Sequence, residues 1–371
     1  MIIGVPKERT ADEYRVGITP EGVALLVGDG HQVLIEQSAG TGSGISDQQY
    51  TTAGAIIMVS EEQLFEQADM VVKVKEPTLA ECQLLRQQQI LFSYLHLVAH
   101  YDVMEALLEK KISAIGYETV QLPDGSLPLL VPMSEIAGRL SVQIGASFLQ
   151  KQHGGKGCLL SGASGASPGH VAILGSGVVG SNAAMIAIGL GARVTILGED
   201  QNQLNQHKNR YGDRITTLVA NTTTVQKTLC DADLAIGAIH VVGSRTPLLV
   251  TQEMLSLMTS GSVIVDVSVD QGGCFETSHP TTHRDPVFTI EDILHYGVPN
   301  MPSIVPQTST RALTHASIPM IRRVGKLGLQ QVINTDPVIA SGLNLFDGSV
   351  YCRGVAKTFG LKWKTLTNIN L

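Results

Sequence analysis

The chain has 371 residues, of which 43% are hydrophobic and 16% charged, and its formal net charge is −7 at pH 7. This length exceeds that of one typical hydrophobic core and predicts two or three domains. The apolar composition excludes a disordered chain, the acidic balance argues against a nucleic-acid surface, and no basic run points to anionic lipid. The first residues, MIIGVPKERT, also lack the apolar core of a secretion signal.

The five cysteines are scattered along the chain, and no two of them are spaced as a CxxC pair. This pattern is typical of reduced thiols and predicts neither disulfides nor a zinc site. We therefore expect a soluble, cytoplasmic α/β protein that binds no metal, no nucleic acid and no membrane.

The first part of the chain alternates between apolar segments and helical segments. One helix is predicted to begin with Thr19 as its N-cap and Pro20 at the first helical position. The alternation predicts a parallel-sheet domain that ends near residue 130. The expected strands are residues 2–5, 31–36, 55–59, 70–74, 90–95 and 114–117.

A long amphipathic helix is expected next, with Ser134 as its N-cap and Gln152 as its last residue. Apolar side chains at positions 136, 140, 144 and 148 recur at helical spacing and share one face. We interpret this helix as the bridge into a second domain.

The stretch from His170 to Leu197 carries the most specific motif of the chain. It has the order strand, glycine turn, helix, strand, which is that of a dinucleotide-binding βαβ unit. Gly175 is expected to make the tight turn, Gly177 to let backbone N–H groups approach a pyrophosphate, and Gly180 to let the helix pack on the strand. The N-terminus of that helix favours phosphate through its unpaired N–H groups and its dipole.

The alternation continues, with further strands expected at residues 215–220, 233–240, 262–269 and 295–298. With the two strands of the motif these make six, as in a complete dinucleotide-binding fold. From about residue 306 the chain is predicted to be helical and to cross back to the first domain.

The predicted fold class is therefore α/β with two doubly wound domains, a Rossmann NAD-binding domain being inserted into a parallel-sheet substrate domain. The expected substrate domain comprises residues 1–130 and 305–371, and the expected NAD-binding domain comprises residues 131–304.

Ligands of open parallel sheets bind outside the carboxyl ends of the strands, so titratable residues at those ends are candidates for chemistry. Lys73 and Lys75 end the strand 70–74; either could hold a substrate carboxylate, or simply be a solvated strand end. His96 follows the strand 90–95 and could move protons near neutral pH, or be a hydrogen-bonded core histidine.

Two further candidates lie in loops after predicted strands. Arg15 follows the first strand in EYRVG; arginine suits bidentate carboxylate binding, although most loop arginines are solvated. Asp270 follows the strand VIVDVSV, and after one further residue come two glycines. An acid at this position could orient a water or a histidine. Asp266, within the same strand, is the competing acid. All these candidates are expected around one cleft that faces the nucleotide site.

Long, unbroken motifs of this sequence resemble those of the bacterial alanine dehydrogenase family. They extend over nearly the whole chain, to about Gly342, and are far more specific than the glycine turn. The matching segments are GVPKE, YRVGITP, VKVKEP, LFSYLHL, SLPLLVPMSEIAGRLSVQIGA, ILGSGVVGSNAA, SVIVDVSVDQGGCFETSHPTTH and HYGVPNMPSIVPQTST.

The resemblance implies reversible oxidative deamination of L-alanine to pyruvate and ammonia, with hydride passing to NAD. It implies that Arg15 and Lys75 hold the substrate carboxylate and carbonyl, that His96 is the acid/base, and that Asp270 assists proton transfer. It also implies a homohexamer. The positions that it places against NAD are Ser134, Val178, Val179, Ile239, His240, Val267, Ser268, Val269, Asp270, Val298, Pro299, Asn300 and Met301.

The sequence departs from the family pattern at the tip of the second strand of the motif. The acidic residue expected to bind the adenosine ribose falls on Gly198, and Glu199 and Asp200 follow immediately. We expect a carboxylate displaced by one residue, as at Glu199, to take this role. No arginine nearby could receive a 2′-phosphate, so NAD is expected rather than NADP. Two further family contacts fall on Gln203 and Ala220.

Three other functions share parts of this pattern. The NAD(H)-binding component of a proton-translocating transhydrogenase has the same architecture, but YLHL and VKVKEP favour a dehydrogenase. A lysine-forming dehydrogenase of the saccharopine type would need a larger amino-acid pocket. A non-catalytic NAD-binding module would leave Arg15, Lys75, His96 and Asp270 without a role.

Overall fold

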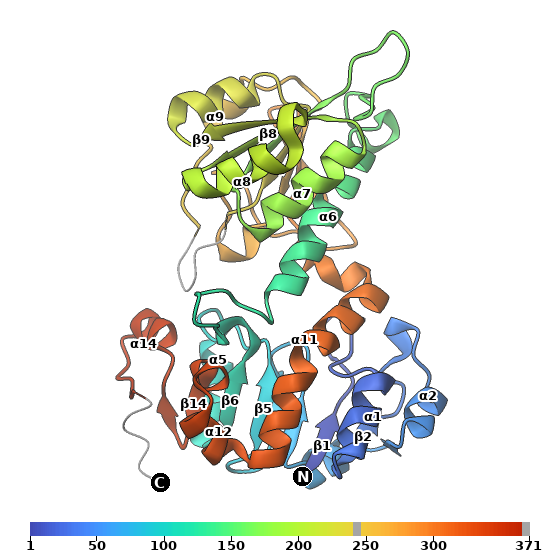
Figure 1. The fold of residues 1–371 in the computed structure, drawn as a ribbon, viewed down its shortest axis with the longest axis vertical. Helices are drawn as coiled ribbons and strands as arrows, with labels where there is room; N and C mark the ends of the chain where they lie inside the picture. The colour runs from blue at the N-terminus through green and yellow to red at the C-terminus, as the bar shows by residue number, and fades with distance from the viewer. Residues whose placement is uncertain (240–245, 366–371) are drawn as a thin grey trace. The chain divides into compact units, whose positions relative to one another are not determined.

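The computed structural model describes residues 1–239 and 246–365. The chain divides into two compact units, the first made of Met1–Met133 and Ser303–Leu371 and the second of Ser134–Pro302 (Figure 1). The second unit is therefore an insertion into the first. Both units contain a sheet made mainly of parallel strands, which confirms the predicted α/β class.

The first unit is built on an eight-stranded sheet with the order β15-β14-β6-β5-β4-β1-β2-β3. Strands β1 to β6 are parallel, whereas β14 is antiparallel to β6 and β15 is antiparallel to β14. The strands are β1 Ile2–Val5, β2 Gln32–Glu36, β3 Ile56–Met58, β4 Met70–Val72, β5 Ile90–Ser93, β6 Ser113–Gly116, β14 Leu343–Phe346 and β15 Ser349–Val350.

The helix predicted from about residue 306 is present as α11, Pro306–Leu327, whereas the strands β14 and β15, which extend this sheet, were not predicted. Both strands are too short for hydrophobic periodicity to reveal. They are joined by Asp347 and Gly348, whose φ angles of 43° and 70° are the left-handed values of a tight hairpin turn. Leu345 of β14 is fully buried, so the hairpin is part of the core.

Several helices of the first unit begin at side-chain N-caps that the sequence supplies. Thr19 accepts a hydrogen bond from the Gly22 N–H, as predicted, and Thr78 forms a capping box with Glu81. The helices are α1 Pro20–Gly28, α2 Asp47–Thr52, α3 Glu61–Gln67, α4 Leu79–Leu84, α5 Tyr101–Glu109, α11 Pro306–Leu327, α12 Leu329–Thr335, α13 Pro337–Ser341 and α14 Arg353–Phe359.

The second unit has a seven-stranded sheet with the order β12-β13-β11-β10-β7-β8-β9. Six strands are parallel, as predicted; the seventh, β12, was not expected and pairs antiparallel with β13 at the edge. The elements are α6 Val131–Phe148, β7 His170–Leu174, α7 Val178–Gly189, β8 Arg193–Gly198, α8 Gln201–Tyr211, β9 Ile215–Val219, α9 Thr222–Leu229, β10 Leu234–Gly237, α10 Gln252–Leu255, β11 Val263–Asp266, β12 Val287–Ile290 and β13 Ile293–Tyr296.

Several predicted bounds are corrected by the structure. Helix α6 begins at Val131, so Ser134 lies inside its first turns and is not its N-cap, and the helix ends at Phe148 rather than at Gln152. Strand β11 ends at Asp266, because the chain then turns through the 3₁₀ helix η5, Val269–Gln271. The acid at the strand tip is therefore Asp266, and Asp270 belongs to the loop beyond it.

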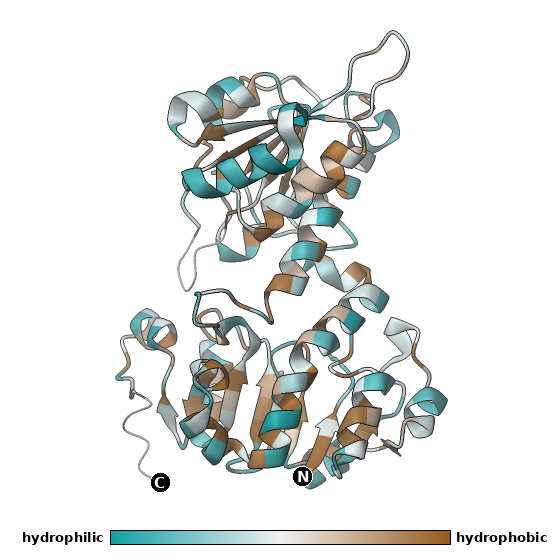
Figure 2. Cartoon of the chain, viewed as in Figure 1, coloured by the Kyte–Doolittle hydropathy of each residue, from teal (hydrophilic) through white to brown (hydrophobic). Residues whose placement is uncertain are grey.

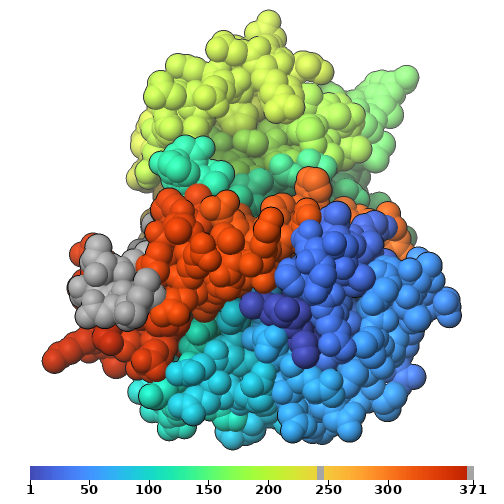
Figure 3. Space-filling view, turned by 60° about the horizontal axis from the view of Figure 1, so that its bottom comes forward, coloured from blue at the N-terminus to red at the C-terminus, as the bar shows by residue number. Residues whose placement is uncertain are grey.

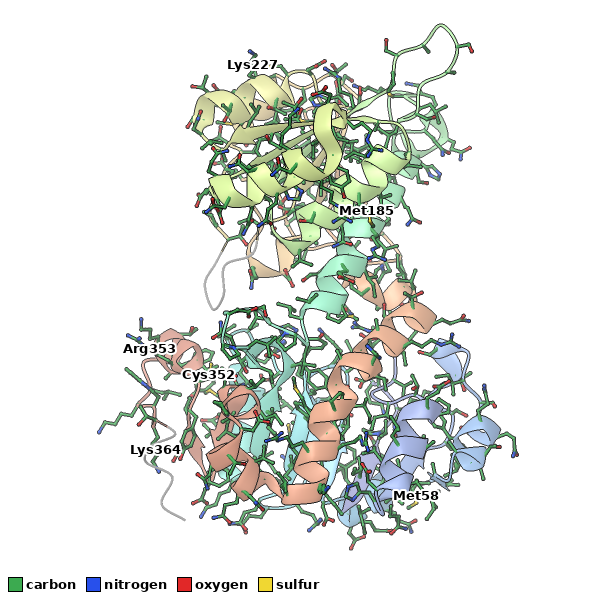
Figure 4. All side chains as sticks on the ribbon, viewed as in Figure 1. Met58, Met185, Lys227, Cys352, Arg353 and Lys364 are labelled. Atoms are coloured by element: carbon green, nitrogen blue, oxygen red, sulfur yellow. The ribbon has the colours of Figure 1, made fainter. Side chains whose placement is uncertain are left out.

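The central parallel strands are buried on both faces and form the centre of each core, whereas the edge strands β3 and β9 are partly exposed. Every residue of β4, β5, β10 and β11 is buried, and Figure 2 shows the apolar colours concentrated on the sheets. Among the described residues, the helices include none that is both long and apolar enough to cross a membrane. The five cysteines are free; Cys352, which directly precedes α14, is one of them (Figure 4).

Candidate active site

Arg15 is a buried arginine in the loop after β1, with 2% of its surface exposed. Glu13 holds it through two charge-assisted hydrogen bonds, from Nε to Oε1 at 2.7 Å and from Nη2 to Oε2 at 2.6 Å. Burial by itself would lower the pKa of Arg15, but the Glu13 carboxylate outweighs it and the pKa is raised. Arg15 is therefore a fixed cation, whose Nη1 lies 3.1 Å from the Sδ of Met133.

The loop that carries Arg15 is tied down by helix α11. The N–H of Val16 donates to Thr310 Oγ1 at 3.2 Å, and the N–H of Thr19 donates to Thr314 Oγ1 at 3.1 Å. Figure 3 shows α11, in orange-red, against the blue N-terminal residues. A segment distant in sequence thus supports the backbone at Arg15.

Lys73 and Lys75 have different surroundings, which the strand-end rule did not distinguish. Lys73 is 1% exposed, and its Nζ lies 2.5 Å from Glu81 Oε1 and 3.3 Å from Glu8 Oε2. Burial alone would lower the pKa of Lys73, but the two carboxylates outweigh it and the pKa is raised. Lys73 is therefore a cation of the core, and its ammonium group is engaged by two carboxylates.

Lys75 lies beyond β4 and its side chain remains 15% exposed, with Nζ 3.6 Å from Glu76 Oε2. Its backbone is held by the same Glu8 that pairs with Lys73. The Glu8 carboxylate accepts the N–H of Val74 at 2.6 Å and that of Lys75 at 3.4 Å. Lys73, Glu8 and Glu81 form a buried ion cluster. Through Glu8, this cluster positions the segment that carries Lys75.

His96 follows β5 and is half-buried, in a backbone conformation with a φ of 44° that only a few per cent of non-glycine residues adopt. The carboxylate of Glu118 accepts the N–H of His96 at 2.8 Å and that of Leu95 at 3.1 Å. The imidazole stacks on the ring of Tyr94, with a centroid distance of 5.9 Å. Burial raises the pKa of Tyr94, whose hydroxyl donates to the Leu129 carbonyl at 2.6 Å.

Arg15, Lys75 and His96 lie beyond the carboxyl ends of neighbouring strands of the first sheet. They follow the adjacent strands β1, β4 and β5, and the N–H of Tyr94 donates to the carbonyl of Val74 at 3.0 Å. Sequence reasoning missed Glu8, Glu13 and Glu118. Glu118 had a usable signal, because it follows a predicted strand directly.

The glycine turn of the second unit has the geometry that the motif predicts. At Gly175, φ is 120° and a Cβ would lie 2.3 Å from the carbonyl oxygen of Ala238. At Gly180, a Cβ would lie 1.9 Å from the carbonyl oxygen of Gly175. Gly177 is the N-cap of α7, so no side chain caps this helix. A Cβ at Gly177 would meet no atom of the described residues within 4 Å. The helix N-terminus at Val178 and Val179 thus offers N–H groups beside open space, which suits a pyrophosphate.

The tip of β8 is filled by a serine rather than by a carboxylate. A Cβ at Gly198 would lie 2.3 Å from Ser176 Oγ, which donates to Gln203 Oε1 at 2.9 Å. Asp200 is engaged as the N-cap of α8, where it accepts the N–H of Asn202 at 2.8 Å. Glu199 is exposed. Of the two carboxylates that follow Gly198, Glu199 is therefore the candidate for the ribose.

The tips of β10 and β11 are joined through Ser268. Its Oγ accepts the N–H of Ile239 at 3.0 Å and donates to the Ile239 carbonyl at 2.7 Å. The N–H of Val267 donates a hydrogen bond to the Gly237 carbonyl. Of the next residues, Val269 is buried, whereas Asp270, in η5, is exposed. His240, the other half of the predicted pair, lies outside the described residues.

The remaining predicted contacts follow β13 or lie on α6. Val298 and Met301 are buried, whereas Pro299, Asn300 and Ser134 are half-buried, and Asn300 has a φ of 60°. By unit, Arg15, Lys75 and His96 belong to the first, and the glycine turn and Asp270 belong to the second. Metal sites of three or more His, Cys, Asp or Glu side chains do not occur in the described part of the chain.

The two sheets and the glycine turn define a two-unit α/β protein with a dinucleotide-binding unit of the Rossmann type. The chain belongs to the alanine dehydrogenase/PNT family, because the model of the family's N-terminal domain matches residues 4–137 and that of its C-terminal domain matches residues 141–353.

Individual relatives match over nearly the full length. The chain is 47% identical over 364 residues to the alanine dehydrogenase of Methanococcus maripaludis and 45% identical over 363 residues to that of Halomonas elongata, covering 98% of this chain and of the relative in both cases. A solved L-alanine dehydrogenase superposes with a TM-score of 0.94 at 47% identity, over 97% of this chain and 99% of that one. A transhydrogenase from Sinorhizobium meliloti, at 21% identity and a TM-score of 0.82 over 94% of this chain and 100% of that one, shares the fold.

The buried ion cluster yields a stability prediction. Substituting Lys73→Met leaves Glu8 and Glu81 buried without their cation, and we expect the free energy of unfolding to fall by about 3–5 kcal/mol. The control is Lys111→Met, because Lys111 and Asp347 form an exposed pair at 3.7 Å whose loss costs less than about 1 kcal/mol. Equal losses in urea denaturation would contradict the role given to Lys73.

Three glycines of the motif helix allow packing and binding to be separated. Gly180→Ala forces the turn apart and should lower both the melting temperature and NADH affinity. Gly177→Ala meets no atom of the described chain within 4 Å, so it should keep the melting temperature and lose NADH affinity by approaching the phosphates. Gly189→Ala, at the exposed end of α7, should change neither. NADH fluorescence titration and thermal melts check all three variants. If Gly177→Ala binds NADH as tightly as the wild type, the pyrophosphate does not bind at this turn.

Proposed function

We propose that the chain is an L-alanine dehydrogenase, which catalyses the reversible NAD-dependent oxidative deamination of L-alanine to pyruvate and ammonia. The observation that carries the proposal is the near full-length identity with alanine dehydrogenases, together with a strand-end set of Arg15, Lys75 and His96. A mere NAD-binding module would have no use for a buried, carboxylate-oriented Arg15. The transhydrogenase alternative is more distant in sequence.

NAD, when bound, accepts the hydride that leaves the Cα of alanine. The turn fits its pyrophosphate, since Gly175, Gly177 and Gly180 leave backbone N–H groups accessible at the start of α7. Glu199 is the proposed partner of the adenosine ribose. The other proposed contacts are Ser134, Val178, Val179, Ile239, His240, Val267, Ser268, Val269, Asp270, Val298, Pro299, Asn300 and Met301.

The first unit supplies the proposed substrate-binding groups. Arg15 is a permanent cation whose guanidinium is pre-oriented by Glu13, so it suits the carboxylate of alanine or pyruvate. Lys75, on a segment fixed by Glu8, would polarise the oxygen that develops on the former Cα. Together they fix which carbon faces the cofactor.

Proton transfer is assigned to His96 and Asp270. His96 suits this task because histidine is the side chain type that takes up and returns protons near neutral pH, here from the ammonium or from the attacking water. Glu118 accepts the backbone N–H of His96, and the ring of Tyr94 stacks on one face of the His96 imidazole. These two contacts limit the orientations of the imidazole. Asp270 is the proposed assistant for water and ammonia. A cytoplasmic homohexamer is the proposed form of the enzyme.

The first test is a direct assay of the purified chain. With L-alanine and NAD at alkaline pH, which favours oxidation because the reaction releases a proton, we expect NADH to form, as followed by its ultraviolet absorbance. Glutamate and saccharopine serve as control substrates. Formation of NADH from either control but not from alanine would refute the proposal.

A second test separates catalysis by His96 from a structural role. In His96→Ala, we expect kcat to fall roughly 10²- to 10⁴-fold, because the group that moves protons is lost. NADH affinity should stay unchanged, since none of the proposed cofactor contacts includes His96. A parallel loss of NADH binding and activity would instead mark His96 as structural.

A further inference from the structure

Asp266 is a buried carboxylate to which the proposed function gives no part. It is the last residue of β11, and 1% of its surface is exposed. Burial raises the pKa of Asp266, and the N–H donors around it, which favour the charged form, oppose part of that rise. Burying a carboxylate costs free energy, so the burial of Asp266 needs a structural or functional explanation.

Both carboxylate oxygens of Asp266 are used as backbone acceptors. Oδ1 accepts the N–H of Ser268 at 3.0 Å. Oδ2 accepts the N–H of Cys274 at 3.0 Å and that of Phe275 at 3.5 Å. One side chain therefore closes the loop 267–275 by holding both of its ends.

Glycines enclose this carboxylate on two sides. A Cβ at Gly237, on the neighbouring strand β10, would lie 2.5 Å from Oδ1 of Asp266. A Cβ at Gly273, whose φ is 73°, would lie 2.6 Å from Oδ2. The loop is thus wrapped closely around the acid, which leaves no room for another side chain there.

The closed loop carries groups that the proposed function needs. Ser268, fixed by Asp266 through its N–H, grips both backbone groups of Ile239 with its hydroxyl. Asp270 lies in η5, between the two ends that Asp266 holds. The Gln271 carbonyl in turn accepts the N–H of Thr246 at 3.0 Å, beyond β10.

We propose that Asp266 is a positioning residue for the reaction. It fixes the loop 267–275 directly, and it fixes Ile239 through Ser268. Asp270 and the backbone at the tips of β10 and β11 are thereby held in position to bind NAD. This rests on the proposed function. Asp266 itself touches neither cofactor nor substrate in this scheme.

The test uses the nearly isosteric substitution Asp266→Asn. Whichever way the new amide is turned, its NH₂ faces at least one N–H that formerly had an acceptor. The matched control is Asp233→Asn. Asp233 also accepts a backbone N–H, from His170 at 2.6 Å, and pairs with Lys156 at 2.5 Å, but it does so at the opposite, amino end of the same sheet.

We expect Asp266→Asn to raise the NADH dissociation constant roughly tenfold and to lower kcat, while KM for L-alanine moves less because Arg15 and Lys75 belong to the other unit. Hydrogen exchange should speed up in peptides covering 267–275. Asp233→Asn should lower the melting temperature but leave NADH affinity and exchange in that loop unchanged.

Wild-type NADH affinity and wild-type loop exchange in Asp266→Asn would overturn the proposal. If that variant does not fold, Ser268→Ala replaces it, because this change keeps Asp266 and removes the hydroxyl that bonds to both backbone groups of Ile239. Since Ser268 is itself a proposed NAD contact, the readout is hydrogen exchange without NADH, and unchanged exchange at residues 237–239 and 267–275 would overturn the proposal. NADH binding and exchange do not depend on alanine, so a failed alanine assay beside a loosened loop would refute the proposed reaction and not the positioning role.

Discussion

Buried carboxylates that accept backbone N–H groups hold the strand tips of both units. Where a parallel strand ends, the next N–H groups lose their ladder partners but are still buried, so they need another acceptor. Glu8 serves the N–H of Lys75 and Glu118 that of His96. Asp266 does the same for the loop that contains Asp270. Each proposed catalytic or substrate-binding side chain here therefore stands on a backbone fixed by an acid that does no chemistry.

The glycine turn is governed by contact distances rather than by charge. The carbonyl of Gly175 lies where a side chain at Gly180 would begin, and the hydroxyl of Ser176 occupies the corresponding space at Gly198. The β8 tip therefore has no room for the carboxylate that dinucleotide-binding folds usually place there. Glu199 remains as the acid next to this position, and it is exposed.

Much of this arrangement could be predicted from the sequence, because it depends on local patterns. Alternating apolar segments predicted six parallel strands of the second sheet, and the strand-end rule selected Arg15, Lys75 and His96. The same rule could not separate Lys73 from Lys75. Both end the same strand, and only the positions of Glu8 and Glu81, one from an earlier loop and one from helix α4, make Lys73 a core cation.

The sequence by itself determined the α/β class, the dinucleotide turn and the family, because these depend on spacing along the chain and on long, unbroken motifs. The tertiary structure alone decided which acids act as supports. Glu13 and Arg15 are neighbours in sequence, yet their burial depends on the packing of the loop after β1 against α11. The antiparallel hairpin of β14 and β15, the early end of β11 and the enclosure of Asp266 also depend on contacts between distant segments, which no local pattern encodes.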